Sequence, residues 1–81
     1  MIVELKIVCQ SFFAPLESGS FEMNEGATIQ DLLDAALARF GSPDPRKLNY
    51  LLFFMDNAPA NTSTMIRPGA QIMITKALTG G

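Results

Sequence analysis

The chain has 81 residues, a formal net charge of −2 and a hydrophobic content of 48%, which predicts one small domain. It has no histidine and a single cysteine, Cys9, which excludes a Ser-His-Asp triad, an imidazole metal site and an internal disulfide, and favours a reducing compartment. The mild acidity disfavours nucleic-acid binding, because phosphates demand clustered Lys and Arg. Without a membrane-length apolar run or a basic-then-apolar leader, we expect a cytoplasmic protein that does not bind a membrane.

Two strands are expected in the first 24 residues. Residues 2–9 alternate with a period of two, which is typical of a strand whose apolar face is formed by Val3, Leu5, Ile7 and Cys9. Because Cys9 falls on that face, we expect a buried thiol and not a reactive one. Residues 20–24 alternate again after a loop that contains Pro15 and Gly19, so a strand pair is predicted.

The clearest helix in the sequence covers residues 28–40. Thr28 followed three residues later by Asp31 resembles a capping box. A single apolar stripe at helical spacing follows, formed by Ile29, Leu32, Leu33, Ala36, Leu37 and Phe40. Gly41 is the expected stop, and we expect Asp31 and Asp34 to favour the helix dipole without holding a metal ion.

The last third of the chain predicts further strands and tight turns. The continuous apolar run at residues 51–55 favours a strand buried on both faces, followed by a turn cluster at residues 56–61. Pro68 and Gly69 occupy the central positions of an expected type II turn, and residues 71–76 alternate as the last strand. One helix covers only one face of a sheet, so the prediction is an α+β roll.

Three runs of residues resemble a known family. Residues 13–17 read FAPLE, residues 25–33 read EGATIQDLL and residues 78–81 read LTGG. In this order they resemble the MoaD/ThiS family of ubiquitin-like sulfur carriers, and they are most similar to the small subunit of molybdopterin synthase. The resemblance implies a β-grasp fold at residues 1–76, a mixed sheet of four to five strands on one main helix, and a flexible tail at residues 77–81.

The resemblance also implies the function of the tail, Leu78, Thr79, Gly80 and Gly81. A Gly-Gly end can enter a narrow channel, and a terminal carboxylate is ionised at neutral pH. In the family, an E1-like enzyme uses ATP to adenylylate this carboxylate, and sulfur then replaces AMP to give a thiocarboxylate. The expected partners are that enzyme and the large subunit of a sulfur-accepting synthase. The chain itself is then a carrier, not an enzyme, with no bound cofactor or metal.

Two other functions are compatible with the same sequence, and one face of the sheet is expected to bind a partner. The chain could instead be a protein modifier joined to lysine through Gly81, or a non-covalent β-grasp interaction module. The sheet face that the helix leaves bare is the expected docking surface for a protein partner. The candidate docking residues are Ile2, Val8, Phe12, Phe13 and Met73; for the two phenylalanines, a position in the core is an equal alternative.

Overall fold

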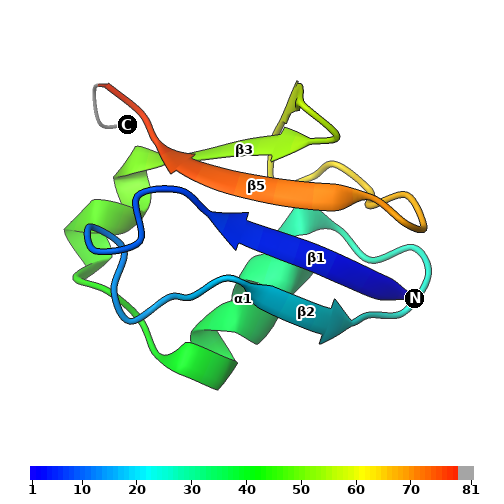
Figure 1. Ribbon diagram of the computed structural model, residues 1–81, viewed down its shortest axis with the longest axis horizontal. Helices are drawn as coiled ribbons and strands as arrows, with labels where there is room; N and C mark the ends of the chain where they lie inside the picture. The colour runs from blue at the N-terminus through cyan, green and yellow to red at the C-terminus, as the bar shows by residue number, and fades with distance from the viewer. Residues whose placement is uncertain (79–81) are drawn as a thin grey trace.

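A single mixed sheet packs against one α-helix in the computed structural model, which describes residues 1–78 (Figure 1). The elements are β1 (Ile2–Ile7), β2 (Gly19–Glu22), α1 (Ile29–Phe40), the 3-10 helix η1 (Pro45–Tyr50), β3 (Leu51–Met55), β4 (Ala58–Ala60) and β5 (Gln71–Lys76). The strand order is β2-β1-β5-β3-β4, with β1 and β5 parallel and the other neighbours antiparallel. The predicted α+β roll with one main helix is confirmed.

The first strand has the predicted alternation but ends two residues earlier than expected. Val3, Leu5 and Ile7 are at most 4% exposed and form one wall of the core. The amide of Val8 still donates to the carbonyl of Ile74 at 2.8 Å, and the chain then turns away from the sheet. Cys9 therefore lies in the loop beyond β1, where it packs against the core but is only half-buried, so it is less buried than predicted.

The helix begins and ends as its sequence predicts. The hydroxyl of Thr28 accepts a hydrogen bond from the Asp31 amide at 3.3 Å, and the Asp31 carboxylate accepts one from the Thr28 amide at 2.9 Å, which completes the capping box. Gly41 ends the helix at φ +96°, a backbone conformation that favours glycine. The buried stripe consists of Ile29, Leu32, Leu33 and Ala36, and it covers one face of the sheet.

Strand β3 corrects one prediction about burial. Only Phe53 is buried in the run 51–55, whereas Leu52 is 40% exposed. Because α1 covers a single face of the sheet, alternate residues of β3 point to a face that no other element among residues 1–78 covers (Figure 1). The apolar run was therefore wrongly interpreted as a strand buried on both faces.

The helix η1 was not predicted. The Asp44 carboxylate accepts a hydrogen bond from the Arg46 amide at 3.0 Å, and Pro45 occupies the first helical position. This short helix fills the segment between the stop of α1 and the start of β3. It thereby brings Lys47 and Tyr50 close to the end of β5, where the amide of Ala77 donates to the Tyr50 carbonyl at 2.8 Å.

Asp56 fastens the β3–β4 hairpin to the start of β5. Asp56 and Asn57 both have positive φ values, +49° and +70°, as a two-residue type I′ turn requires. The Asp56 carboxylate accepts hydrogen bonds from the Gln71 amide and the Arg67 guanidinium, each at 2.9 Å. These contacts, the Gln71 hydrogen bond first, hold the pKa of the Asp56 carboxyl below its ordinary value.

The Asp56 contacts predict a pH-dependent stability. The ionised form is favoured by folding, so its contribution is complete above the ordinary Asp pKa and is lost as the pH falls through the lower folded pKa. We expect Asp56→Asn to lower the midpoint of thermal unfolding at neutral pH and to approach the wild-type midpoint in acid. Asparagine tolerates the same backbone and fits the same space. Circular dichroism between neutral and strongly acidic pH measures this difference, and a difference that does not change with pH would contradict the assignment.

Candidate functional site

The sheet has an open face opposite α1 that carries an apolar row. The pairs Lys6–Met73 and Met73–Phe54 lie side by side across β1, β5 and β3, and Leu52 pairs with Thr75 in the next row. Ile2 is 55% and Leu52 40% exposed, while Met73 and Phe54 are half-buried. Glu4, Lys6 and Thr75 surround the apolar side chains, so this open face combines an apolar centre with a polar rim, as protein-docking surfaces do.

The predicted docking residues fall into two groups. Ile2 and Met73 lie on the open face, and the alternation of β1 places Val8, 46% exposed, at the end of the same face. Phe13 is 0% exposed and belongs to the core, so its prediction as a docking residue is wrong. Phe13 is buried because the loop after β1 folds back, with the Phe13 amide donating to the Cys9 carbonyl at 3.2 Å.

Two residues of the open face were missed in the sequence. Leu52 and Phe54 belong to the apolar run that was interpreted as wholly buried. The available signal was the count of helices: with one helix to cover the sheet, every second residue of this run has to face outward.

Phe12 is half-buried at the edge of the core, where it belongs to a second cluster of side chains. Its ring packs edge to face on Tyr50 with centroids 5.6 Å apart, and on Phe13 at 4.9 Å. Together with Asp44, Arg46, Lys47 and Lys76, Phe12 and Tyr50 line an open hollow beside the end of β5. The Arg46 side chain lies 2.9 Å from the Asp44 carboxylate, lowers the pKa of Asp44 and has its own pKa raised by that contact.

The C-terminal segment leaves the sheet next to this hollow. Lys76 is the last residue of β5, Ala77 is held by Tyr50, and Leu78 is 99% exposed. Thr79, Gly80 and Gly81, on which the predicted tail chemistry depends, lie outside the described residues. The structure shows where the tail begins: after the last residue of β5 the chain leaves the sheet and reaches the surface (Figure 1).

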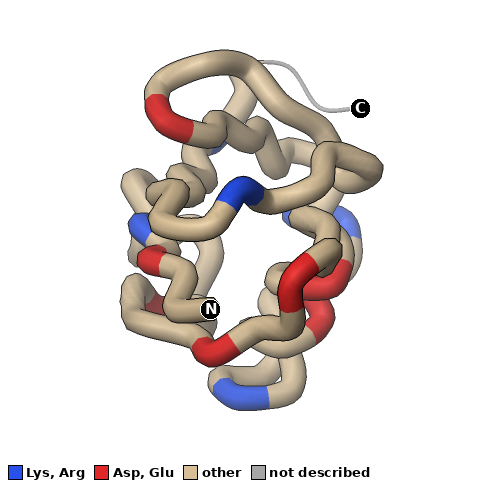
Figure 2. The backbone as a smooth tube through the Cα atoms, turned by 90° about the vertical axis from the view of Figure 1, so that its right-hand side faces the viewer, with Lys and Arg blue, Asp and Glu red and all other residues tan. Residues whose placement is uncertain are grey.

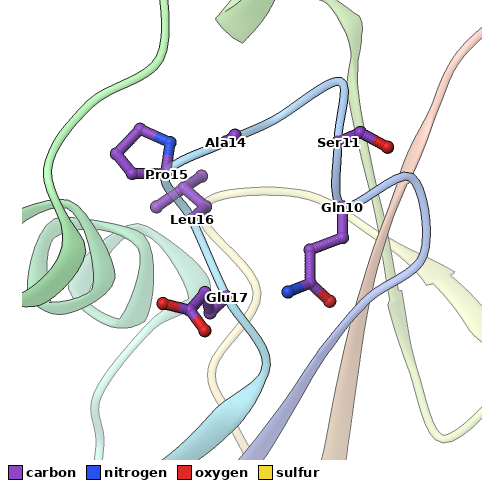
Figure 3. A pocket seen from close by; sticks show the side chains of 6 residues that line it. All are labelled: Gln10, Ser11, Ala14, Pro15, Leu16 and Glu17. Atoms are coloured by element: carbon purple, nitrogen blue, oxygen red, sulfur yellow. The ribbon is translucent and has the colours of Figure 1, made fainter.

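Another hollow lies in the loop between β1 and β2. Its lining residues are Gln10, Ser11, Ala14, Pro15, Leu16 and Glu17, with Gln10 and Ser11 across the opening from Pro15 and Leu16 (Figure 3). Glu17 is its one titratable side chain. A single carboxylate with no basic or nucleophilic partner does not form an acid–base pair, so this hollow supplies no catalytic arrangement.

The described part of the chain contains no candidate metal site and no membrane-spanning helix. Within residues 1–78, no three His, Cys, Asp or Glu side chains lie close enough together to hold a metal ion. Over the same residues, no helix has the length and apolar character needed to cross a membrane. Figure 2, which looks from the side where the N-terminus lies, shows basic and acidic positions interspersed along the backbone.

The comparisons with known proteins identify the fold. No protein-family model matches the chain, and no curated protein matches it in sequence. The structure is similar to SAMP1 from Haloferax volcanii, with a TM-score of 0.78, 16% identity and full coverage of both chains. It is also similar to H. volcanii small archaeal modifier protein 1, with a TM-score of 0.70 and 13% identity over 95% of this chain and 98% of that one.

A third similarity is to a protein–protein complex of subunits 1 and 2 of molybdopterin-converting factor from Helicobacter pylori 26695. The TM-score is 0.63 at 19% identity, with full coverage of both chains. These similarities, together with the mixed five-stranded sheet on one helix, establish the ubiquitin-like β-grasp fold.

Proposed function

We propose that the protein is a sulfur carrier that acts through the carboxylate of Gly81. The observation that carries the proposal is a β-grasp domain whose last strand leads directly to the surface, followed in the sequence by Thr79-Gly80-Gly81. Glycine leaves the end of the tail without side chains, so it can enter a narrow channel in a partner enzyme. In this proposal the chain supplies the reacting carboxylate and the partner supplies catalysis.

The proposed chemistry has two steps, adenylation of the carboxylate and replacement of AMP by sulfur. A carboxylate oxygen of Gly81 attacks the α-phosphorus of ATP in an E1-like enzyme, pyrophosphate leaves, and an acyl-adenylate forms. Hydrosulfide, or an equivalent donor at the sulfide oxidation level, then attacks the acyl carbon, AMP leaves with the broken C–O bond, and Gly81 keeps the sulfur as a thiocarboxylate. ATP belongs to the partner enzyme, and the chain needs no bound cofactor of its own.

The proposed acceptor is the precursor of molybdopterin, bound to the larger subunit of a synthase. The likeness to the H. pylori molybdopterin-converting factor structure supports this choice, as does the resemblance of residues 13–17 and 25–33 to that family. Thiamine synthesis or another sulfur-requiring pathway in the cytoplasm is the alternative acceptor within the same proposal.

A protein modifier is the second candidate function. The similarity to small archaeal modifier protein 1 over nearly the whole chain favours it. In that case the Gly81 adenylate leads to an isopeptide bond with a lysine of another protein. A non-covalent interaction module, with an inert tail, is the third possibility.

Mass spectrometry of the protein from its native host separates these functions. We expect a C-terminal peptide in which one oxygen of Gly81 is replaced by sulfur. Conjugates that leave Gly-Gly on lysine side chains after digestion would instead establish the modifier. If neither species forms, and deletion of Gly81 leaves the cellular function intact, the tail is inert and the carrier proposal fails.

The open face predicts a separable binding defect. Leu52→Glu places a charge at an exposed position of the open face, so we expect binding to the adenylating partner to weaken roughly tenfold or more while folding is preserved. Ala38→Glu, on the exposed side of α1, is the matched control. Isothermal titration calorimetry measures both; equal affinities for the two variants would exclude the open face as the docking surface.

A further inference from the structure

Two aromatic rings and two lysine ammonium groups meet at the base of the C-terminal segment, away from the open face. This tail-base cluster consists of Phe12, Lys47, Tyr50 and Lys76. Lys47 Nζ lies 4.9 Å and Lys76 Nζ 5.0 Å from the centroid of the Phe12 ring, and Lys76 Nζ is also 5.4 Å from the Tyr50 centroid. The cluster is assembled from the β1–β2 loop, η1 and β5, so the fold and not the local sequence creates it.

The cluster is a positive site in a chain that is acidic overall. Its hollow is lined by Arg46, Lys47 and Lys76 against one acidic residue, Asp44. The rest of the chain has three basic and seven acidic residues. The ion pairs among residues 1–78 join Arg46 to Asp44 and Arg67 to Asp56, so within that range neither lysine is neutralised by a carboxylate.

The aromatic rings shape what the lysines can bind. Each ammonium lies against a ring at cation–π distance, and its N–H donors that do not face the ring remain free for an acceptor. An anionic acceptor group, such as a carboxylate, fits beside either ammonium.

The position of the cluster indicates which molecule would bring that carboxylate. Lys76 is the last residue of β5, and the Ala77 amide donates to Tyr50, a member of the cluster. The hollow therefore lies beside the end of β5, from which the chain continues toward the tail. A negatively charged surface there would find its complement in the two lysines.

We propose that the tail-base cluster docks an acidic segment, rich in Asp or Glu, of the protein partner that takes up the C-terminal tail. This inference rests on the proposed function. It adds to that function an electrostatic contact that positions the partner before the tail is threaded, independent of the apolar open face. Contacts of this kind act chiefly on the rate of association and its salt dependence.

A peptide titration tests the cluster without any enzyme. Tetraglutamate is added to the full-length ¹⁵N-labelled chain at low salt, and tetraglutamine serves as the uncharged control. We expect tetraglutamate alone to shift the amide resonances of Lys47, Tyr50 and Lys76. Shifts spread equally over Lys6, Arg39 and Arg67 would overturn the proposal, as would no shift at all.

Matched variants separate the cluster from net charge. Lys47→Gln/Lys76→Gln and Ala58→Glu/Ser63→Glu both change the formal charge from −2 to about −4. Ala58 and Ser63 are exposed, and Ala58 pairs with Met55, at the opposite end of β3 from Lys76. We expect the peptide shifts to disappear in the lysine variant and to persist in the glutamate variant. Loss in both variants would assign the effect to net charge and overturn the proposal.

The same variants are then measured with the adenylating enzyme of the source organism. Loss of two exposed ionic contacts is expected to weaken association about tenfold at low salt, with a smaller loss at high salt. If the wild-type chain is adenylated and both variants bind alike, the docking proposal fails while the proposed function stands. If the wild-type chain is not adenylated, the proposed function fails, and the peptide titration alone tests whether the cluster binds an acidic segment.

An oligonucleotide titration tests for a different ligand. A single-stranded oligonucleotide that shifts the same amides more than tetraglutamate would show that the cluster prefers a nucleic acid to an acidic protein segment, and would overturn the proposal.

Discussion

Deletion of Gly81 is expected to abolish adenylation by the partner enzyme. The deletion moves the terminal carboxylate back by about 3.5 Å, the reach of one extended residue. A misplacement of about 1 Å at a reacting centre can cost about a hundredfold in rate, so we expect a loss of at least that size. Pyrophosphate exchange, with the enzyme in excess, measures the rate directly.

Two comparisons make the Gly81 result specific. Gly81→Ala keeps the carboxylate at the same distance and adds one methyl group, so we expect a smaller loss from it. The free energy of unfolding should not change in either variant, because the last backbone hydrogen bond of the described residues is made by Ala77. Normal adenylation of the shortened chain would contradict a role for the Gly81 carboxylate.

Phe13→Ala is expected to be the most destabilising of the substitutions considered, with a loss of about 3–5 kcal/mol. The Phe13 side chain is 0% exposed and lies in the core cluster, so its removal leaves a cavity. Phe12→Ala removes a half-buried ring with edge contacts to Phe13 and Tyr50, so about 1–2 kcal/mol is expected. Urea unfolding followed by circular dichroism suits a chain without tryptophan.

These neighbouring phenylalanines also separate stability from binding. Phe12→Ala should disturb the tail-base cluster, and thus the response to tetraglutamate, at a small cost in stability. Phe13→Ala should have a large cost in stability but should leave the response to tetraglutamate largely intact at temperatures where the variant remains folded. An equal cost in stability for both substitutions would contradict the different burial of the two rings.

The elements that the sequence predicted well are those with local signals. The capping box of Thr28 and Asp31, the apolar stripe and Gly41 define α1 within one residue of its observed start. Alternation predicted β1, β2 and β5, because each strand has one covered face. The open face was partly predictable for the same reason, and Ile2 and Met73 lie on it.

The features that were missed depend on contacts between distant segments. Gly41 was interpreted as the end of the helical part of the chain, and η1 has no apolar period to indicate it. The placement of β5 between β1 and β3 depends on tertiary packing. The same packing decides that Phe13 is fully buried while its neighbour Phe12 is only half-buried. The tail-base cluster brings together Phe12, Tyr50 and Lys76, which no short-range pattern connects.

The central position of β5 has a consequence for how the protein folds. Strands β1 and β2 form one hairpin and β3 and β4 another, and only β5 joins them into one sheet. Because β5 follows the other four strands in the chain, the two hairpins remain separate during synthesis until residues 71–76 have emerged. The parallel pairing of β1 with β5 closes a long loop, a connection that slows folding. The segment that leads into the tail is therefore also the segment that completes the domain, so a chain cut short before it has no continuous sheet to present to a partner.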